Sequence, residues 1–167
     1  MSFKNISPYD LTQNPFQLIG KDWMLITAKN GDKINTMTAS WGGVGILWNK
    51  PVAFVFVRPT RYTFEFIENC DTFSLNFLPS EFKKELSYCG TVSGRDEDKI
   101  KKCGFTVSEE IATPYFEESD TVFICRKHYA DMLSCEGFIS PEIDAECYAD
   151  KNYHKLYIVE IEKVLKK

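Results

Sequence analysis

Several short segments of this 167-residue chain are apolar or alternate between apolar and polar residues, as β-strands do. Residues 23–27 form an apolar, β-prone segment, and residues 33–38 form a second segment with a period of two. Asn30-Gly31-Asp32 lies between them, and this sequence favours a two-residue hairpin turn because both central positions tolerate positive φ. The pattern predicts an antiparallel hairpin over residues 23–38.

Further along the chain, the pattern predicts four more strands and a few short helices. Residues 51–57 form a continuous apolar run, which is typical of a strand buried on both faces. The remaining expected strands are 72–77, 121–129 and 156–164, and the expected helices are 62–69 with Thr60 as N-cap, 79–90, and 96–103 ending at Gly104. The glycines at 42, 43 and 45 are expected to end the regular strand and to let the backbone approach a ligand.

This succession of elements favours a mainly β fold. Many short strands with few helices indicate an antiparallel barrel rather than a doubly wound sheet. The chain has no G-x-G-x-x-G motif after a strand, which argues against the usual dinucleotide fold. It has no internal repeats or linkers, so we expect a single domain over residues 1–167.

Composition narrows the possible partners. The hydrophobic content of 44% is ample for one buried core, and the net charge of −4 does not favour a nucleic-acid surface. No apolar run approaches the roughly 20 residues that span a bilayer, and the first residues do not resemble a signal peptide, so we expect a cytoplasmic protein without a membrane partner. The six cysteines are expected to be free thiols. Their spacing from the two histidines does not suit zinc, and we predict no metal site.

The stretch from residue 35 to residue 45 is the first candidate for chemistry. Thr36, Thr38 and Ser40 recur with a period of two and would share one side of a strand, with Met37 and Ala39 on the other. Hydroxyls and backbone N–H groups can bond the polar edge of a ring system, and Trp41 can lie near the plane of the ring. The alternative is a strand with a solvent-facing Thr/Ser edge.

A second candidate lies between residues 58 and 63, at the end of a predicted strand. It carries two guanidinium groups, two hydroxyls and a phenol, contributed by Arg58, Thr60, Arg61, Tyr62 and Thr63. Two arginines beside a helix N-terminus form a composition suited to phosphate. The alternative is a solvated turn with two surface arginines.

Two weaker candidates follow. Ser93, Gly94 and Lys99 could add a hydroxyl, backbone amides and an ammonium group to the same anion, or they could belong to a polar loop that caps the next helix. His154 precedes the last predicted strand, and it could reach a ligand or have only a structural role.

Together these motifs resemble those of the flavin reductase-like, FMN-binding split-barrel family, which includes the flavoredoxins. The matching motifs are N-T-M-T-A-S-W at 35–41, R-P-T-R-Y-T at 58–63, S-G-R-D-E-D-K at 93–99 and Y-H-K-L-Y-I at 153–158. The resemblance implies an antiparallel six-stranded split barrel that forms a homodimer, with FMN at or near the subunit interface. It implies that main-chain atoms of Met37 to Trp41 run along the isoalloxazine ring. It further implies that Arg58 to Thr63 hold the ribityl chain and phosphate, and that Ser93 to Lys99 lie near the phosphate. Family members often have Gly where this chain has Val159, a departure that weakens the assignment of His154.

The resemblance leaves three functions open. The first is a flavin reductase or related oxidoreductase that uses NADH or NADPH. The second is a flavoredoxin-type electron carrier with tightly bound FMN and a protein partner, and the third is a barrel without cofactor that acts as a binding module. No catalytic side chain is predicted, because the flavin itself performs the redox chemistry.

Overall fold

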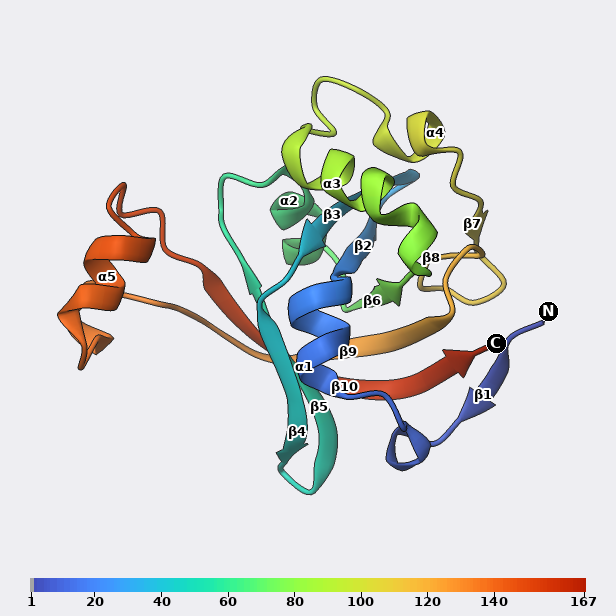
Figure 1. The fold of residues 1–167 in the computed structure, drawn as a ribbon, viewed down its shortest axis with the longest axis horizontal. Coiled ribbons are helices and arrows are strands. Elements are labelled where there is room, and N and C mark those ends of the chain that lie inside the picture. Colours follow the sequence, from blue (N-terminus) through green and yellow to red (C-terminus); the bar gives the residue numbers. More distant parts are fainter. Residues whose placement is uncertain (1) are drawn as a thin grey trace.

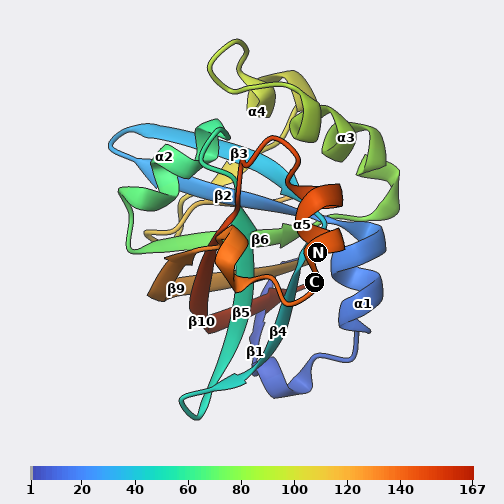
Figure 2. The ribbon, with the colours of Figure 1, turned by 90° about the vertical axis from the view of Figure 1, so that its left-hand side faces the viewer.

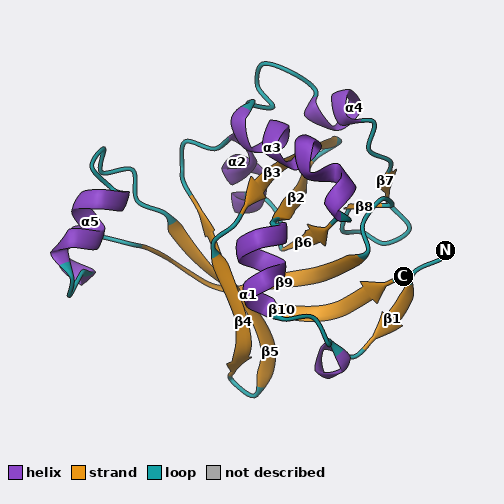
Figure 3. Ribbon diagram, in the orientation of Figure 1, coloured by secondary structure: helices purple, strands orange, loops and turns teal. Residues whose placement is uncertain are grey.

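An antiparallel sheet forms the centre of the protein, as the computed structural model shows for residues 2–167 (Figures 1 and 3). Its strands lie in the order β3-β2-β6-β9-β10-β5-β4, with β1 added beside β10. Their bounds are β1 (Lys4–Ile6), β2 (Met24–Asn30), β3 (Lys33–Ala39), β4 (Gly42–Leu47), β5 (Lys50–Val57), β6 (Thr72–Phe77), β9 (Thr121–Met132) and β10 (Lys155–Lys166). The predicted mainly β, antiparallel fold class is confirmed, with eight strands in this sheet rather than six. Two further short strands, β7 (Val107–Ser108) and β8 (Tyr115–Phe116), pair with each other.

The predicted hairpin is present as β2 and β3. Thr27 lies opposite Thr36, and the register is continuous from Met24 to Asn30. The two-residue turn is Gly31-Asp32, and only Gly31 has a positive φ, of 59°, rather than both central residues as expected. The local sequence therefore determines both the strands and their register.

The split in the barrel lies between β3 and β4. These strands are consecutive in sequence but stand at opposite ends of the strand order, and Ser40 and Trp41 connect them. Strand β3 ends at Ala39, and the prediction that the glycines end the regular structure is wrong, because Gly42, Gly43 and Gly45 lie within β4, which begins at Gly42 and pairs with β5. A Cβ at Gly42 would lie 2.8 Å from the carbonyl oxygen of Phe54. The close backbone approach at Gly42 is therefore to the neighbouring strand.

The helices are short and lie around the sheet. They are α1 (Pro15–Gln17), which continues into a π-helical turn (Leu18–Asp22), α2 (Tyr62–Glu68), α3 (Lys83–Thr91), α4 (Lys99–Cys103) and α5 (Pro141–Cys147). Three 3-10 turns cover Pro8–Asp10, Ser80–Phe82 and Cys135–Gly137. α3 and α4 lie over β2 and β3, whereas α5 stands away from the barrel beyond the ends of β9 and β10 (Figures 1 and 2). Among residues 2–167, every helix falls short of the length and apolar character needed to cross a bilayer.

Strand β2 is buried on both faces, which explains why its sequence is apolar without strict alternation. Met24 and Ile26 face the barrel interior, where they join a core that includes Phe73 and Tyr157. Leu25 faces the other way and packs in a second cluster beneath α3 and α4. β2 thus ties the barrel to the helical layer that borders the candidate site.

Candidate functional site

Two adjoining pockets share Arg61 and contain almost all of the predicted site residues. The wide pocket has a volume of about 270 Å³, and it is lined by Met37, Thr38, Ala39, Ser40, Trp41, Phe56, Arg58, Arg61 and His154. The narrow pocket has a volume of about 150 Å³, and it is lined by Thr60, Arg61, Tyr62, Thr63, Thr91, Val92, Ser93, Gly94 and Lys99. The fold thus brings together four motifs that are distant in sequence.

Thr36 is the one predicted residue that lines neither pocket. It is fully buried, its hydroxyl lies 2.9 Å from that of Thr27, and it donates to the carbonyl of Ile26 at 3.1 Å. The Thr38 hydroxyl donates to the Leu86 carbonyl in α3. Both hydroxyls therefore serve internal packing, because α3 covers the face of β3 that was expected to face a ligand.

Two cations, Arg61 and Lys99, converge on the narrow pocket. Arg61 donates from Nη1 to the carbonyl of Gly90 at 2.7 Å and from Nη2 to that of Cys89 at 3.3 Å. Lys99 Nζ donates to the same Cys89 carbonyl at 2.9 Å, and only 3% of its surface is exposed. Within residues 2–167, no carboxylate forms an ion pair with either cation. The pocket therefore presents positive charge that the protein itself does not neutralise.

Burial affects both of these cations. Desolvation lowers the pKa of Arg61 and lowers the pKa of Lys99 to about 8, because a low-dielectric site disfavours the charged form. The positive charge of Arg61 acts in the same direction on the pKa of Lys99. An anion in the narrow pocket would reverse both effects, so the arrangement favours an anionic ligand.

Asn35 organises the wall of the narrow pocket. Its Nδ2 donates to the hydroxyl of Thr63 at 3.0 Å, and a Cβ added at Gly94 would lie 2.2 Å from its Oδ1. The loop at Gly94 therefore reaches β3 only because this residue has no side chain. Sequence reasoning did not assign Asn35 a role, although it begins the same motif as Thr36.

Thr60 has a different partner from the one predicted. Helix α2 begins after Arg61, which is its N-cap and makes no side-chain capping bond, so the predicted Thr60 cap is wrong. The Thr60 hydroxyl instead accepts a bond from Asn152 Nδ2 at 2.9 Å. This bond connects the edge of the narrow pocket to the segment that follows α5.

Arg58 lines the wide pocket rather than the narrow one. Its Nη2 donates to the carbonyl of Cys147 at 3.0 Å, and its Nη1 lies 3.6 Å from the Asp150 carboxylate. The guanidinium carbon lies 5.4 Å from the ring centre of Tyr148. Arg58 thus holds the α5 segment against the end of β5, and the two arginines of the motif have separate environments.

His154 also lines the wide pocket. Its ring centre is 5.3 Å from that of Trp41, and its Nδ1 is 2.8 Å from the Tyr148 hydroxyl. Burial, followed by the positive charge of Arg58, lowers the pKa of His154 to about 4. The imidazole is therefore neutral near pH 7.

Two aromatic residues of this region were missed from the sequence. Phe56 lines the wide pocket, and its position two residues before Arg58, which directly follows β5, directs both side chains toward the same pocket. This spacing of two residues could have identified Phe56 from the sequence. Tyr148 is distant from Phe56 in sequence and belongs to no repeating pattern, and only the folded α5 segment brings it to His154.

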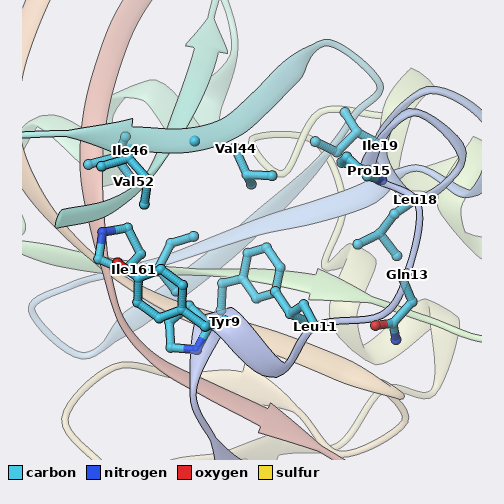
Figure 4. A pocket seen from close by; sticks show the side chains of 14 residues that line it. Tyr9, Leu11, Gln13, Pro15, Leu18, Ile19, Val44, Ile46, Val52 and Ile161 are labelled. Carbon is cyan, nitrogen blue, oxygen red and sulfur yellow. The ribbon is translucent and has the colours of Figure 1, made fainter. Parts of the chain in front are cut away.

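A third, apolar pocket lies between the N-terminal arm and the barrel (Figure 4). Tyr9, Leu11 and Leu18 come from the arm, and Val44 and Ile46 come from β4. Its volume is about 310 Å³, and none of its lining side chains is charged. This lining does not suit a phosphate, so the two pockets that share Arg61 remain the candidate site.

Comparison with known proteins gives consistent matches. The family model described as "flavin reductase like domain" matches residues 17–166. Flavoredoxin from Methanosarcina acetivorans has 26% sequence identity and a TM-score of 0.68, covering 87% of this chain and 68% of that protein. An FMN-binding domain of a flavin reductases-like enzyme from Shewanella baltica OS155 has the same fold at 17% identity, with a TM-score of 0.69 and coverage of 98% and 76%. An uncharacterized protein from Archaeoglobus fulgidus is 30% identical over 97 residues, which are 57% of this chain and only 54% of that relative.

Proposed function

Since this chain belongs to the flavin reductase like domain family, we propose that it binds FMN across the two pockets and acts as an NADH- or NADPH-dependent oxidoreductase. FMN would supply the hydride and electron transfer chemistry. The protein would bind the cofactor, orient it and leave part of it accessible to a reductant.

The buried cation pair carries this proposal. Arg61 and Lys99 share the Cys89 carbonyl and lie beside the Thr63 and Ser93 hydroxyls in the narrow pocket. A phosphate dianion would accept charge-assisted hydrogen bonds from both cations and would offset their desolvation. The phosphate of FMN is the part of the cofactor that these residues fit.

The wide pocket fits the ring of the cofactor. β3 is an end strand of the sheet order, so the backbone groups on its outer edge are not used by a further strand. Met37 to Trp41 lie along this pocket, and their main-chain N–H and C=O groups can bond the polar edge of an isoalloxazine. Trp41 and the neutral His154 flank the same space.

The reductant would need space next to the ring. A further hollow of about 430 Å³ shares Ser40 and Trp41 with the wide pocket, and it also includes Phe16. This hollow leaves room for a nicotinamide or another planar donor on the far side of Trp41. No catalytic side chain is assigned, and the neutral His154 of the wide pocket would act through hydrogen bonding.

The second candidate is an electron carrier with tightly held FMN, and the similarity to a flavoredoxin favours it. Both functions use the same pockets, so binding alone does not separate them. Carriers and reductases differ in whether a nicotinamide reduces the bound flavin directly.

We also infer that the working form is a homodimer. The β4–β5 hairpin exposes Ile46 at 58% and Trp48 at 50%, and exposed large apolar residues of this kind are typical of subunit interfaces. Light scattering after gel filtration measures the mass directly, and a mass near that of one 19.3 kDa chain would contradict this inference.

The function is tested by titrating the apoprotein with FMN and following flavin fluorescence. The complex is then mixed anaerobically with NADH or NADPH, and bleaching of the flavin absorbance is recorded. Absence of FMN binding would exclude both redox functions. Binding without bleaching by either nicotinamide would favour the carrier and would rule out the oxidoreductase.

A further inference from the structure

Two thiols meet directly behind the narrow pocket. The sulfur atoms of Cys89 in α3 and Cys103 in α4 are 3.7 Å apart. Cys89 is fully buried, whereas Cys103 is partly exposed. No other pair of cysteine sulfurs within residues 2–167 makes such a contact, and Cys135 is exposed at a distant site.

This thiol pair is joined to the cation pair through one carbonyl. The Cys89 carbonyl accepts a bond from both Arg61 and Lys99, so a shift of this carbonyl changes a contact of each cation. Lys99 also belongs to α4, the helix that carries Cys103. A change in the distance between Cys89 and Cys103 would therefore act on both sides of the Lys99 bond.

We propose that Cys89 and Cys103 form a reversible disulfide in response to hydrogen peroxide, and that this disulfide weakens anion binding in the narrow pocket. The second part rests on the proposed FMN function, whereas the first part does not. The site is thus a modification site that links the redox state of two thiols to the occupancy of the neighbouring pocket.

The chemistry proceeds in two balanced steps. The Cys103 sulfur, as thiolate, attacks one peroxide oxygen; the O–O bond breaks, and the released hydroxide takes up a proton to leave as water. The Cys89 sulfur then attacks the sulfenic sulfur of Cys103, the S–O bond breaks, and a second water leaves with the Cys89 proton. The two thiols lose two electrons in total, and the peroxide gains them.

The order of these steps follows from burial. Burial raises the pKa of Cys89 to about 12 and also raises the pKa of Cys103, so neither thiol is activated for fast reaction. Peroxide from solvent can reach only the partly exposed Cys103. Cys89 then lies close enough to resolve the sulfenic acid before further oxidation.

The structural consequence follows from bond length. A disulfide bond is about 2.05 Å long, so the two sulfurs must approach by roughly 1.6 Å from their distance of 3.7 Å. The Cys89 side chain packs among Leu25, Leu86 and Phe116, which leave little room for it to move alone. Cys103 and α4 therefore make most of the approach, and movement of α4 displaces Lys99 relative to the shared carbonyl.

The first experiment maps the disulfide and does not depend on FMN. The apoprotein is treated with hydrogen peroxide, digested without reduction and examined by mass spectrometry. We expect a linked pair of peptides that contain Cys89 and Cys103, reversed by dithiothreitol and absent in Cys103→Ser. The Cys135→Ser variant should still form the link. Oxidation of Cys103 to sulfinic acid with Cys89 left reduced, or a link to another cysteine, would overturn the site.

The second experiment measures the coupling. Oxidation should weaken FMN binding at least fivefold, leave riboflavin binding within twofold, and have no effect in Cys103→Ser. Equal FMN affinity in both redox states would overturn the coupling while the mapped disulfide stands. Hydrogen exchange of the backbone amides at 89–92 monitors the wall of the narrow pocket without FMN. We expect the exchange rates to change on oxidation. If reduced protein fails to bind FMN, the proposed function fails, and the exchange measurement still decides whether the disulfide reaches the pocket.

Discussion

The hydroxyl of Tyr148 lies 2.8 Å from Nδ1 of His154, and this contact joins the α5 segment to the wide pocket. Tyr148 is almost fully buried, and its ring also contacts the guanidinium of Arg58. Since Arg58 extends from β5 and His154 precedes β10, a single tyrosine connects the two strand ends that border the pocket. The position of His154 thus depends on a segment outside the barrel.

His154 should remain neutral throughout the physiological range. Its pKa is lowered to about 4, so its ring resonances should not titrate between pH 8 and pH 5.5. The chain has only two histidines, and His128→Gln leaves His154 as the single signal in an NMR titration. Arg58→Gln removes the nearby positive charge and should raise the pKa. A midpoint near 6.5 in the protein with Arg58 would contradict the buried, neutral ring.

The lowered pKa of His154 makes the free energy of unfolding depend on pH. The unfolded chain protonates His154 near its ordinary pKa of about 6.5, whereas the folded chain does so near 4. The unfolded state therefore binds more protons between these values, and the free energy of unfolding falls as the pH falls from 6.5 to 4. Urea denaturation of the protein and of His154→Gln across this range should show a shallower fall in the variant.

Arg61 should contribute to FMN binding through the phosphate. Arg61→Ala should weaken FMN binding by about 1.5 to 3 kcal/mol, the usual worth of a hydrogen bond to a charged group. Riboflavin lacks the phosphate, so its affinity should fall much less in the same variant. Arg61→Lys keeps the charge, and its FMN affinity should lie between those of the unchanged protein and Arg61→Ala. An equal loss for FMN and riboflavin would show that Arg61 acts through its bonds to Cys89 and Gly90 rather than through phosphate.

Lys99 should make FMN binding depend on pH. Its pKa is about 8 without ligand, and a bound phosphate dianion should raise it. Binding then takes up a proton above pH 8, so FMN affinity should fall as the pH rises from 8 to 10. Calorimetry in buffers of different ionisation enthalpy measures this uptake. Lys99→Met should bind more weakly and with a flat profile over this range, and a flat profile with Lys99 present would refute the assignment.

Trp41 should act on the ring and not on the phosphate. Trp41→Ala should weaken FMN and riboflavin equally, by about 1 kcal/mol for the lost aromatic contact. Trp48 is a matched control, because it is also 50% exposed and lies outside both pockets. Trp48→Ala should leave both affinities within twofold, provided that gel filtration shows an unchanged oligomeric state. A loss confined to FMN in Trp41→Ala would contradict the ring assignment.

The sequence by itself determined six of the eight strands of the sheet, one hairpin register and the chemical types gathered at the site. The two-residue turn Gly31-Asp32 joins β2 to β3, and glycine at its first position accepts the positive φ there without a steric cost. The cations and hydroxyls of the second and third motifs were also identifiable, because phosphate binding requires these groups in any fold. These features depend on local sequence or on residue chemistry, so they can be identified without knowledge of long-range contacts.

Only the tertiary structure decided which of these groups meet. A period of two placed Thr36 and Thr38 on one face of β3, but α3, which comes from a distant part of the chain, covers that face. The tertiary structure also separates the two arginines of the second motif. Arg58 binds the α5 segment, whereas Arg61 meets Lys99 at the Cys89 carbonyl. Periodicity gives the direction of a side chain relative to its own strand, whereas its partners depend on long-range packing that the strand's own sequence does not encode.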